Sequence, residues 1–105
     1  MHPTGSLSFK DLEGQSFKEK FLSSHGAILV DVRTPGEFGF GSIVGANNID
    51  FMSPSFKDQF LKLDREKEYF LFCQSGTRSR MACTLLAREG YTVYNLDEGI
   101  DTWPK

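Results

Sequence analysis

The chain has 105 residues, of which 39% are hydrophobic and 25% are charged, and its formal net charge is −2. These values are typical of one globular domain, so we predict a single domain over residues 1–105, with residues 1–5 forming a frayed end. They exclude a disordered tail, a collagen and a disulfide scaffold. With no excess of basic residues and no apolar run long enough for a bilayer, neither nucleic acid nor a membrane is an expected partner.

The N-terminal segment, MHPTGSLSF, lacks both the charged and the apolar region of a secretory signal. We therefore expect a cytoplasmic protein, with the periplasm as the alternative if an N-terminal segment is missing from the sequence. The sequence has two cysteines, Cys73 and Cys83, and two histidines, His2 and His25, and their spacing fits no zinc site. Neither a metal nor a cofactor is expected.

The predicted strands and helices alternate along the chain. We predict, in order, a strand at Ser6–Phe9, a helix at Gln15–Ser24, a strand at Ala27–Val30, a helical turn at Glu37–Phe40, a weak strand at Asn47–Ile49, a helix that begins at Ser53–Pro54 and continues to Leu63, a strand at Tyr69–Phe72, a helix at Arg78–Glu89, a strand at Thr92–Tyr94 and a short helix at Leu96–Trp103. This alternation predicts an α/β fold with a mainly parallel sheet. Ligands of such sheets bind beyond the carboxyl ends of the strands.

The loop after the Tyr69–Phe72 strand has the composition of a reactive site. Cys73 stands at the strand end, and the residues from Gln74 to Ser79 are small, polar or basic. Gly76 permits positive φ, so successive N–H groups can turn inward as an anion-binding nest, and the next helix adds its N-terminal dipole. Such surroundings lower a thiol pKa from about 8.5 to between about 3.5 and 7.5. We therefore predict a nucleophilic thiolate at Cys73; the alternative is a structural cysteine that closes a buried strand.

Three sequence motifs carry a family resemblance. Cys73–Ser79 has the sequence CQSGTRS, the segment from Ile28 to Ile49 contains DVR, EF and GSIVGANNI, and the segment from Gly90 to Trp103 begins with GY and ends with W. They resemble the C-x-x-G-x-R-S active-site loop, the D-V-R…E-F…G-H-I-x-G-A-x-N-I segment and the closing G-Y…L-x-G-G…W of single-domain rhodaneses, which are sulfurtransferases. The resemblance covers nearly the whole chain.

The resemblance implies a five-stranded, mainly parallel sheet with helices on both faces, and a cysteine that carries sulfur as a persulfide. Cys73 would take the outer sulfur of thiosulfate or another persulfide donor and pass it to a thiophilic acceptor such as cyanide, a small thiol or a protein thiol. No metal or cofactor takes part in such a reaction. Around catalytic Cys73, the predicted substrate-binding residues are Gln74, Ser75, Gly76, Thr77, Arg78 and Ser79.

The sequence departs from the family pattern at two positions, and two other functions stay open. Ser42 stands where the family usually has His, and Glu98 where it often has the first Gly of a pair. Phosphatases and arsenate reductases of the same fold have five residues between Cys and Arg, whereas four residues separate Cys73 from Arg78. The shorter loop suits a single sulfur atom rather than a tetrahedral oxyanion. A non-catalytic interaction module is the third reading, and the presence of both Cys73 and Arg78 argues against it.

Charged residues near the strand ends are expected to hold the loops. We predict an ion pair between Arg33 and Glu37, or one centred on Asp31. Arg80 either extends a positive rim or is a solvated surface charge. Cys83 falls among apolar residues of its helix, which favours a small buried side chain over a resolving thiol.

Overall fold

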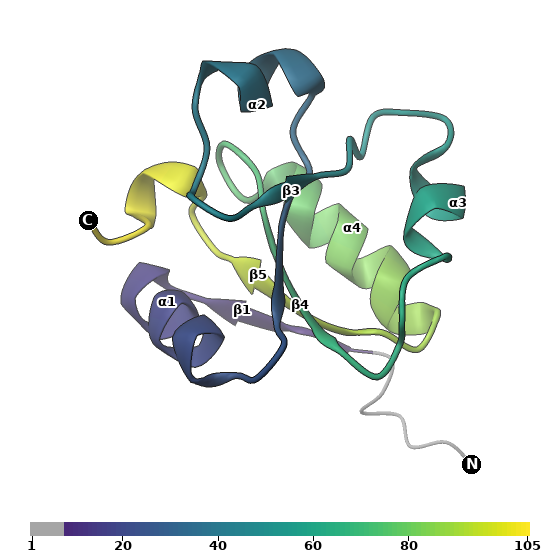
Figure 1. Cartoon of the computed structure of the whole chain (residues 1–105), viewed down its shortest axis with the longest axis horizontal. Helices are drawn as coiled ribbons and strands as arrows, with labels where there is room; N and C mark the ends of the chain where they lie inside the picture. Colours follow the sequence, from purple (N-terminus) through teal and green to yellow (C-terminus); the bar gives the residue numbers. More distant parts are fainter. Residues whose placement is uncertain (1–7) are drawn as a thin grey trace.

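The computed structural model describes residues 8–105, in which five parallel strands form one sheet with helices on both faces (Figure 1). The strand order is β1-β5-β4-β2-β3, and every pairing is parallel. The strands are β1 (Lys10–Leu12), β2 (Ile28–Asp31), β3 (Asn47–Asn48), β4 (Glu68–Phe72) and β5 (Thr92–Leu96). The helices are α1 (Gly14–Ser23), α2 (Pro35–Phe40), α3 (Phe56–Phe60), α4 (Thr77–Arg88) and the 3-10 helix η2 (Ile100–Thr102). The predicted α/β class and five-stranded sheet are confirmed.

Strand β4 lies in the middle of the sheet and is apolar because both of its faces are covered. Its side chains alternate between two cores: Tyr69 and Leu71 pack under α3 and α4, whereas Phe70 and Phe72 pack under α1. All four are fully buried. A continuous apolar run is the pattern expected of a strand in such a sheet. Cys73 follows directly and lies in the core under α4.

The two helical layers cover opposite faces of the sheet. On one face, Phe17 of α1 packs edge-on against Phe70, with ring centroids 5.4 Å apart, and also against Trp103 at 6.1 Å. On the other face, α4 buries Ala82, Cys83, Leu86 and Ala87 against the sheet. The N-terminal end of α4 lies at the carboxyl end of β4, since only residues 73–76 connect the two elements (Figure 1).

Strand β1 begins later than predicted. Ser8 and Phe9 lie outside the strand, which starts at Lys10, and the prediction for residues 6–7, like the predicted fraying of 1–5, falls outside the described residues. Strand β5 sets this register, because Lys10 pairs with Tyr94 and Leu12 with Leu96. An edge strand contacts a single neighbour, so its own sequence pattern is a weak guide to its position.

Two predicted helices are shorter in the structure. Helix α3 starts at Phe56 because residues 53–55 form a turn, in which the Ser53 hydroxyl accepts from the Ser55 amide at 3.2 Å instead of capping a helix. The predicted helix at Leu96–Trp103 is reduced to η2, since Leu96 still belongs to β5 and Gly99 has φ +91°. Among residues 8–105, none of the helices combines the length and the apolar character needed to cross a membrane.

Candidate active site

Cys73 is the residue that connects the central strand β4 to the loop before α4. Cys73 is fully buried, and its carbonyl accepts a hydrogen bond from the amide of Ile100 at 2.9 Å. After it, Gln74 and Ser75 are exposed, Gly76 is buried, and α4 begins at Thr77. The sequence therefore places the thiol at the carboxyl edge of the sheet, where parallel sheets bind their ligands.

Three hydrogen-bond donors converge on the sulfur of Cys73. The amide of Gly76 lies 3.1 Å from Sγ, and the amide and the hydroxyl of Ser79 each lie 3.4 Å from it. Two of these donors are amides at the start of α4, so the helix dipole also favours negative charge at this point. The predicted nest of N–H groups is thus present around the thiol, with Gly76 and Ser79 as its members.

The pKa of the Cys73 thiol is lowered from its ordinary value. Burial is the largest single influence and raises the pKa, because it disfavours the thiolate. The hydrogen bonds from the Ser79 side chain and from the amides of Ser79, Ser75 and Gly76 together outweigh it. A sulfur held in this way has the character of an activated nucleophile without a neighbouring base.

Gly76 is required by the shape of the loop. It has φ +94°, and a Cβ at this position would overlap the carbonyl oxygen of Asp97. Without a side chain, Gly76 can place its amide on the sulfur while its own carbonyl accepts from the Ser79 hydroxyl at 3.3 Å. Any larger residue would push the loop away from the segment that follows β5.

Arg78 does not contact the sulfur; it forms a two-pronged ion pair with Glu37 of α2. The Nη1–Oε1 distance is 2.7 Å and the Nη2–Oε2 distance is 2.9 Å. The sulfur is still close enough to contribute electrostatically, since Cys73, after Glu37, is among the groups that raise the pKa of Arg78. The guanidinium therefore borders the site without donating to Cys73.

A buried ion pair between Asp31 and Arg33 holds the neighbouring strand end. The Asp31 carboxylate accepts from Nη2 of Arg33 at 2.8 Å and from the hydroxyl of Ser42 at 2.8 Å. Arg33 also donates to the carbonyl of Gly41 at 2.7 Å and to the side-chain oxygen of Gln74 at 3.3 Å. Of the two predicted ion pairs, the one centred on Asp31 is confirmed, whereas Glu37 pairs with Arg78 instead of Arg33. Ser42, at the departure from the family pattern, is a member of this network.

The remaining predicted residues have separate surroundings. Thr77 is exposed at the first turn of α4, and Arg80 pairs with Asp97 at 2.8 Å, so it does not project as a free positive rim. Cys83 is fully buried and unbridged, and burial raises the pKa of its thiol well above the ordinary value. The predicted burial of Cys83 is confirmed. Within residues 8–105, no cluster of three or more His, Cys, Asp or Glu side chains could hold a metal ion.

The segment after β5 supports the loop, and the sequence gives little sign of this role. Gly99, with φ +91°, packs against the carbonyl of Gln74, and the side-chain amide of Gln74 donates to Asp101 at 3.3 Å. Gly99 belongs to the closing motif, which could have indicated a close backbone contact. Nothing in the local sequence indicates the contact made by Asp101.

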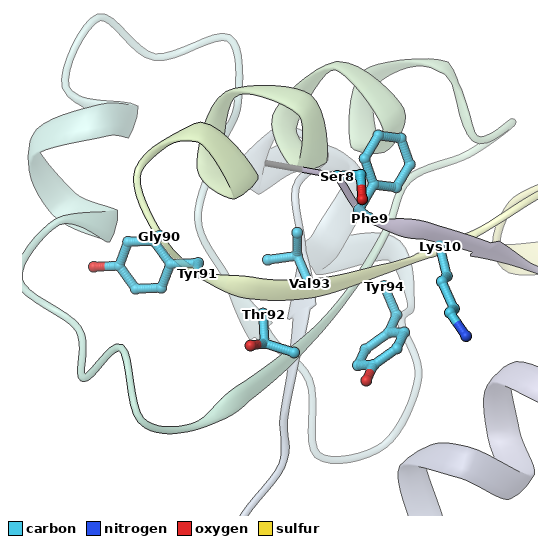
Figure 2. A pocket seen from close by; sticks show the side chains of 8 residues that line it. All are labelled: Ser8, Phe9, Lys10, Gly90, Tyr91, Thr92, Val93 and Tyr94. Atoms are coloured by element: carbon cyan, nitrogen blue, oxygen red, sulfur yellow. The ribbon is translucent and has the colours of Figure 1, made fainter. Parts of the chain in front are cut away.

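A surface pocket away from the Cys73 loop lies along β5 and the start of β1 (Figure 2). Its lining residues are Ser8, Phe9, Lys10, Gly90, Tyr91, Thr92, Val93 and Tyr94. They lie along the first part of β5 and at the start of β1, whereas the Cys73 loop follows the carboxyl end of β4. The side chains labelled in Figure 2 include neither a cysteine nor a carboxylate, so this pocket offers no counterpart of the activated thiol.

The chain is similar to known proteins in both sequence and fold. Residues 13–105 match the family described as the rhodanese-like domain. The chain is 34% identical over 96 residues to a protein named thiosulfate sulfurtransferase GlpE from Ectopseudomonas mendocina, covering 90% of this chain and 84% of that protein. It is 28% identical to a protein named sulfurtransferase from Allochromatium vinosum, covering 90% and 88%. A crystal structure of a rhodanese-like domain protein from Staphylococcus aureus superposes with a TM-score of 0.79 at 27% identity, covering 92% and 93%.

The fold and the cysteine loop define a parallel α/β domain with a thiol at a helix N-terminus. This chain belongs to the rhodanese-like domain family, and the resemblance noted in its sequence is confirmed.

Proposed function

We propose that this protein is a sulfurtransferase that carries a sulfane sulfur on Cys73 as a persulfide. One observation carries the proposal: the amides of Gly76 and Ser79 and the Ser79 hydroxyl all point at the sulfur of a single cysteine. The family membership and the printed names of the relatives support it. Thiosulfate or another persulfide is the donor class, and a small or protein thiol, or cyanide, is the acceptor class.

The reaction is a double displacement. The Cys73 thiolate attacks the outer sulfur of the donor, a new S–S bond forms at Cys73, and the old S–S bond breaks; with thiosulfate, sulfite leaves with the bonding electron pair. The acceptor then attacks the outer sulfur of the persulfide, and the Cys73 thiolate leaves. The donors around Cys73 stabilise the negative charge that the resting thiolate and the persulfide both carry.

Access to the sulfur depends on the loop that covers it. Cys73 is fully buried, while its neighbours Gln74, Ser75 and Thr77 are exposed. A donor reaches the sulfur when these exposed polar residues are displaced, because the strand beneath is fixed by the core. A surface groove between Ser42–Val44 and the C-terminal segment lies beside this loop and gives an acceptor room to approach.

The test is the mass of the intact protein after incubation with thiosulfate. Wild type and Cys83→Ala are expected to gain the mass of one sulfur atom, and cyanide is expected to remove it as thiocyanate. Cys73→Ser is expected to gain none, because a serine hydroxyl is not ionised at neutral pH. Equal sulfur loading of Cys73→Ser and wild type would overturn the proposal, and far-ultraviolet circular dichroism would confirm that the variant is folded.

A further inference from the structure

The positively charged residue of the cysteine loop, Arg78, already forms an ion pair with a carboxylate of the protein itself. Arg78 is the only basic residue between Gln74 and Ser79. Both of its terminal nitrogens are bound by Glu37, at 2.7 and 2.9 Å. A two-pronged pair is the strongest geometry between a guanidinium and a carboxylate. Arg78 therefore has little capacity left to bind an anionic ligand at the sulfur.

The two other arginines near the site are also paired with carboxylates. Nη2 of Arg33 lies 2.8 Å from Oδ2 of Asp31, and Nη2 of Arg80 lies 2.8 Å from Oδ1 of Asp97. Arg33 also interacts electrostatically with both Glu37 and Arg78, so the charges at this edge of the sheet act on one another. Each of these three guanidiniums is paired with a carboxylate, so none of them offers an unpaired charge to a dianion.

Helix α2 holds Glu37 in place independently of Arg78. Glu37 and Thr34 form a capping box, in which the Glu37 carboxylate accepts from the Thr34 amide at 3.0 Å and the Thr34 hydroxyl accepts from the Glu37 amide at 3.3 Å. The carboxylate is thus held by hydrogen bonds within its own helix as well as by Arg78. The hydrogen bond from Arg78, followed by that from the Thr34 backbone, lowers the pKa of Glu37 to about 2, so it stays ionised.

The charge of the donor decides how strongly it feels Glu37. Thiosulfate carries two negative charges and releases sulfite, another dianion. A persulfide R–S–S⁻, or its protonated form, carries at most one charge at the reacting group, and a thiosulfonate carries one. Glu37 is paired with Arg78, the guanidinium that interacts electrostatically with Cys73. Coulomb energies are proportional to charge, so the carboxylate disfavours the dianion about twice as strongly, in free energy, as a monoanion.

We propose that Glu37 selects the sulfur donor by charge: by closing Arg78 into an ion pair, it favours persulfides and other sulfane-sulfur donors with at most one negative charge over thiosulfate. This rests on the sulfurtransferase function proposed above. With a protonated persulfide, the Cys73 thiolate attacks the outer sulfur, the R–S to sulfur bond breaks, and RS⁻ leaves with the electron pair. The proton stays on the transferred sulfur, and no external oxidant or reductant is needed.

The test compares two donors that share one type of S–S bond and differ by one charge, thiosulfate and methanethiosulfonate. The variant is Glu37→Gln, which removes the charge and keeps the capping box, because Gln also serves at this position of the motif. Freeing Arg78 is expected to raise kcat/KM about tenfold for thiosulfate and about threefold for methanethiosulfonate. Comparing the ratio of the two kcat/KM values between Glu37→Gln and wild type cancels the difference between the leaving groups.

The control variant is Glu66→Gln, which makes the same change of net charge at an exposed residue before the start of β4, at the other end of the strand from Cys73. It is expected to leave the donor ratio unchanged. Arg78→Gln exposes the Glu37 charge and is expected to shift the ratio the opposite way, which keeps the test decisive even if Glu37→Gln folds poorly. A ratio that is unchanged in Glu37→Gln, or shifted equally by Glu66→Gln, would overturn the donor proposal alone. Failure of every donor to load Cys73 would overturn the proposed function and the donor proposal with it.

Discussion

Gly99 lies directly against the carbonyl of Gln74, so close that a Cβ at Gly99 would overlap the carbonyl oxygen. This contact joins the segment after β5 to the loop that follows Cys73. The neighbouring amide of Ile100 donates to the carbonyl of Cys73 at 2.9 Å, and Asp97 packs against Gly76 in the same way. The cysteine loop is therefore held from one side by the chain that leaves β5, although the two segments are more than 20 residues apart.

Gly99→Ala is expected to damage both the stability and the site. Its φ of +91° costs an L-residue about 1–3 kcal/mol, and relief of the overlap must displace the backbone of the Cys73 loop. We expect a loss of about 2 kcal/mol or more in the free energy of unfolding, and a fall of roughly tenfold or more in the rate of sulfur loading, because small displacements at a reacting centre are costly. Urea unfolding and timed mass spectrometry measure the two effects.

The matched control for this change is Gly39→Ala. Gly39 lies in α2, with nothing within 4 Å of a Cβ built there. Alanine in a helix is more favourable than glycine by about 0.5–1 kcal/mol, so this variant is expected to be at least as stable as wild type. Equal losses in Gly39→Ala and Gly99→Ala would show that the Gly99 contact has no special role.

Arg33→Ala is expected to destabilise the protein far more than Arg80→Ala. Arg33 and Asp31 form a buried pair, whereas about 40% of each side chain of the Arg80–Asp97 pair is exposed. Removing one partner of a buried pair costs about 3–5 kcal/mol, because it leaves an uncompensated charge, whereas an exposed pair contributes about 0–1 kcal/mol. The measurement is the free energy of unfolding in urea at pH 7. Similar losses in the two variants would mean that the Asp31 carboxylate is satisfied without Arg33.

The central part of the site could be predicted from sequence because it is local. The apolar run Tyr69–Phe72 indicates a covered strand, and a cysteine, a glycine and a helix start follow within a few residues. Hydrogen bonds over such short separations, as between Gly76 and Cys73, follow from the loop's own conformation. The nest around the sulfur is therefore accessible to sequence reasoning.

The contacts that brace this loop could not be predicted in the same way. Glu37 and Arg78 are 41 residues apart, and so are Arg33 and Gln74. The pairing of arginines with carboxylates depends on how α2 packs beside the sheet. The hydrophobic periodicity of the sequence does not indicate this packing. The start of β1 is hard to predict for a related reason. Its register is determined by pairing with β5 and not by the short sequence of the strand itself.

Arg78→Ala is expected to reduce the use of thiosulfate more than the use of methanethiosulfonate. The change removes the cation and leaves the Glu37 carboxylate without its ion-pair partner, although the Thr34 amide still donates to it. The uncompensated carboxylate then repels a dianion about twice as strongly, in free energy, as a monoanion, so kcat/KM is expected to fall roughly tenfold for thiosulfate and roughly threefold for methanethiosulfonate. Steady-state kinetics at fixed ionic strength test this, with Arg80→Ala as the control. An equal decrease for both donors would indicate that Arg78 only braces the loop.

The Cys73 thiol is expected to titrate below the free-cysteine value of about 8.5. Its burial raises the pKa, but the hydrogen bonds from Ser79, Ser75 and Gly76 lower it further than burial raises it. The rate of alkylation by iodoacetamide, followed against pH in Cys83→Ala, reports the midpoint without interference from the second thiol. Ser79→Ala removes the hydroxyl donor at 3.4 Å and is expected to move the midpoint upward.

The same shift makes stability depend on pH with a defined sign. Because the folded-state pKa of Cys73 lies below the unfolded one, its ionisation stabilises the fold above the unfolded pKa, and this contribution is lost as pH falls through the folded pKa. Relative to Cys83→Ala alone, adding Ser79→Ala is therefore expected to cost more stability at pH 9 than at pH 5, measured by urea unfolding at both values. In the alkylation experiment, a Cys73 pKa at or above about 8.5 would mean that burial outweighs the hydrogen bonds. Cys73 would then need a general base, and neither Gly76 nor Ser79, whose groups contact its sulfur, could serve as one.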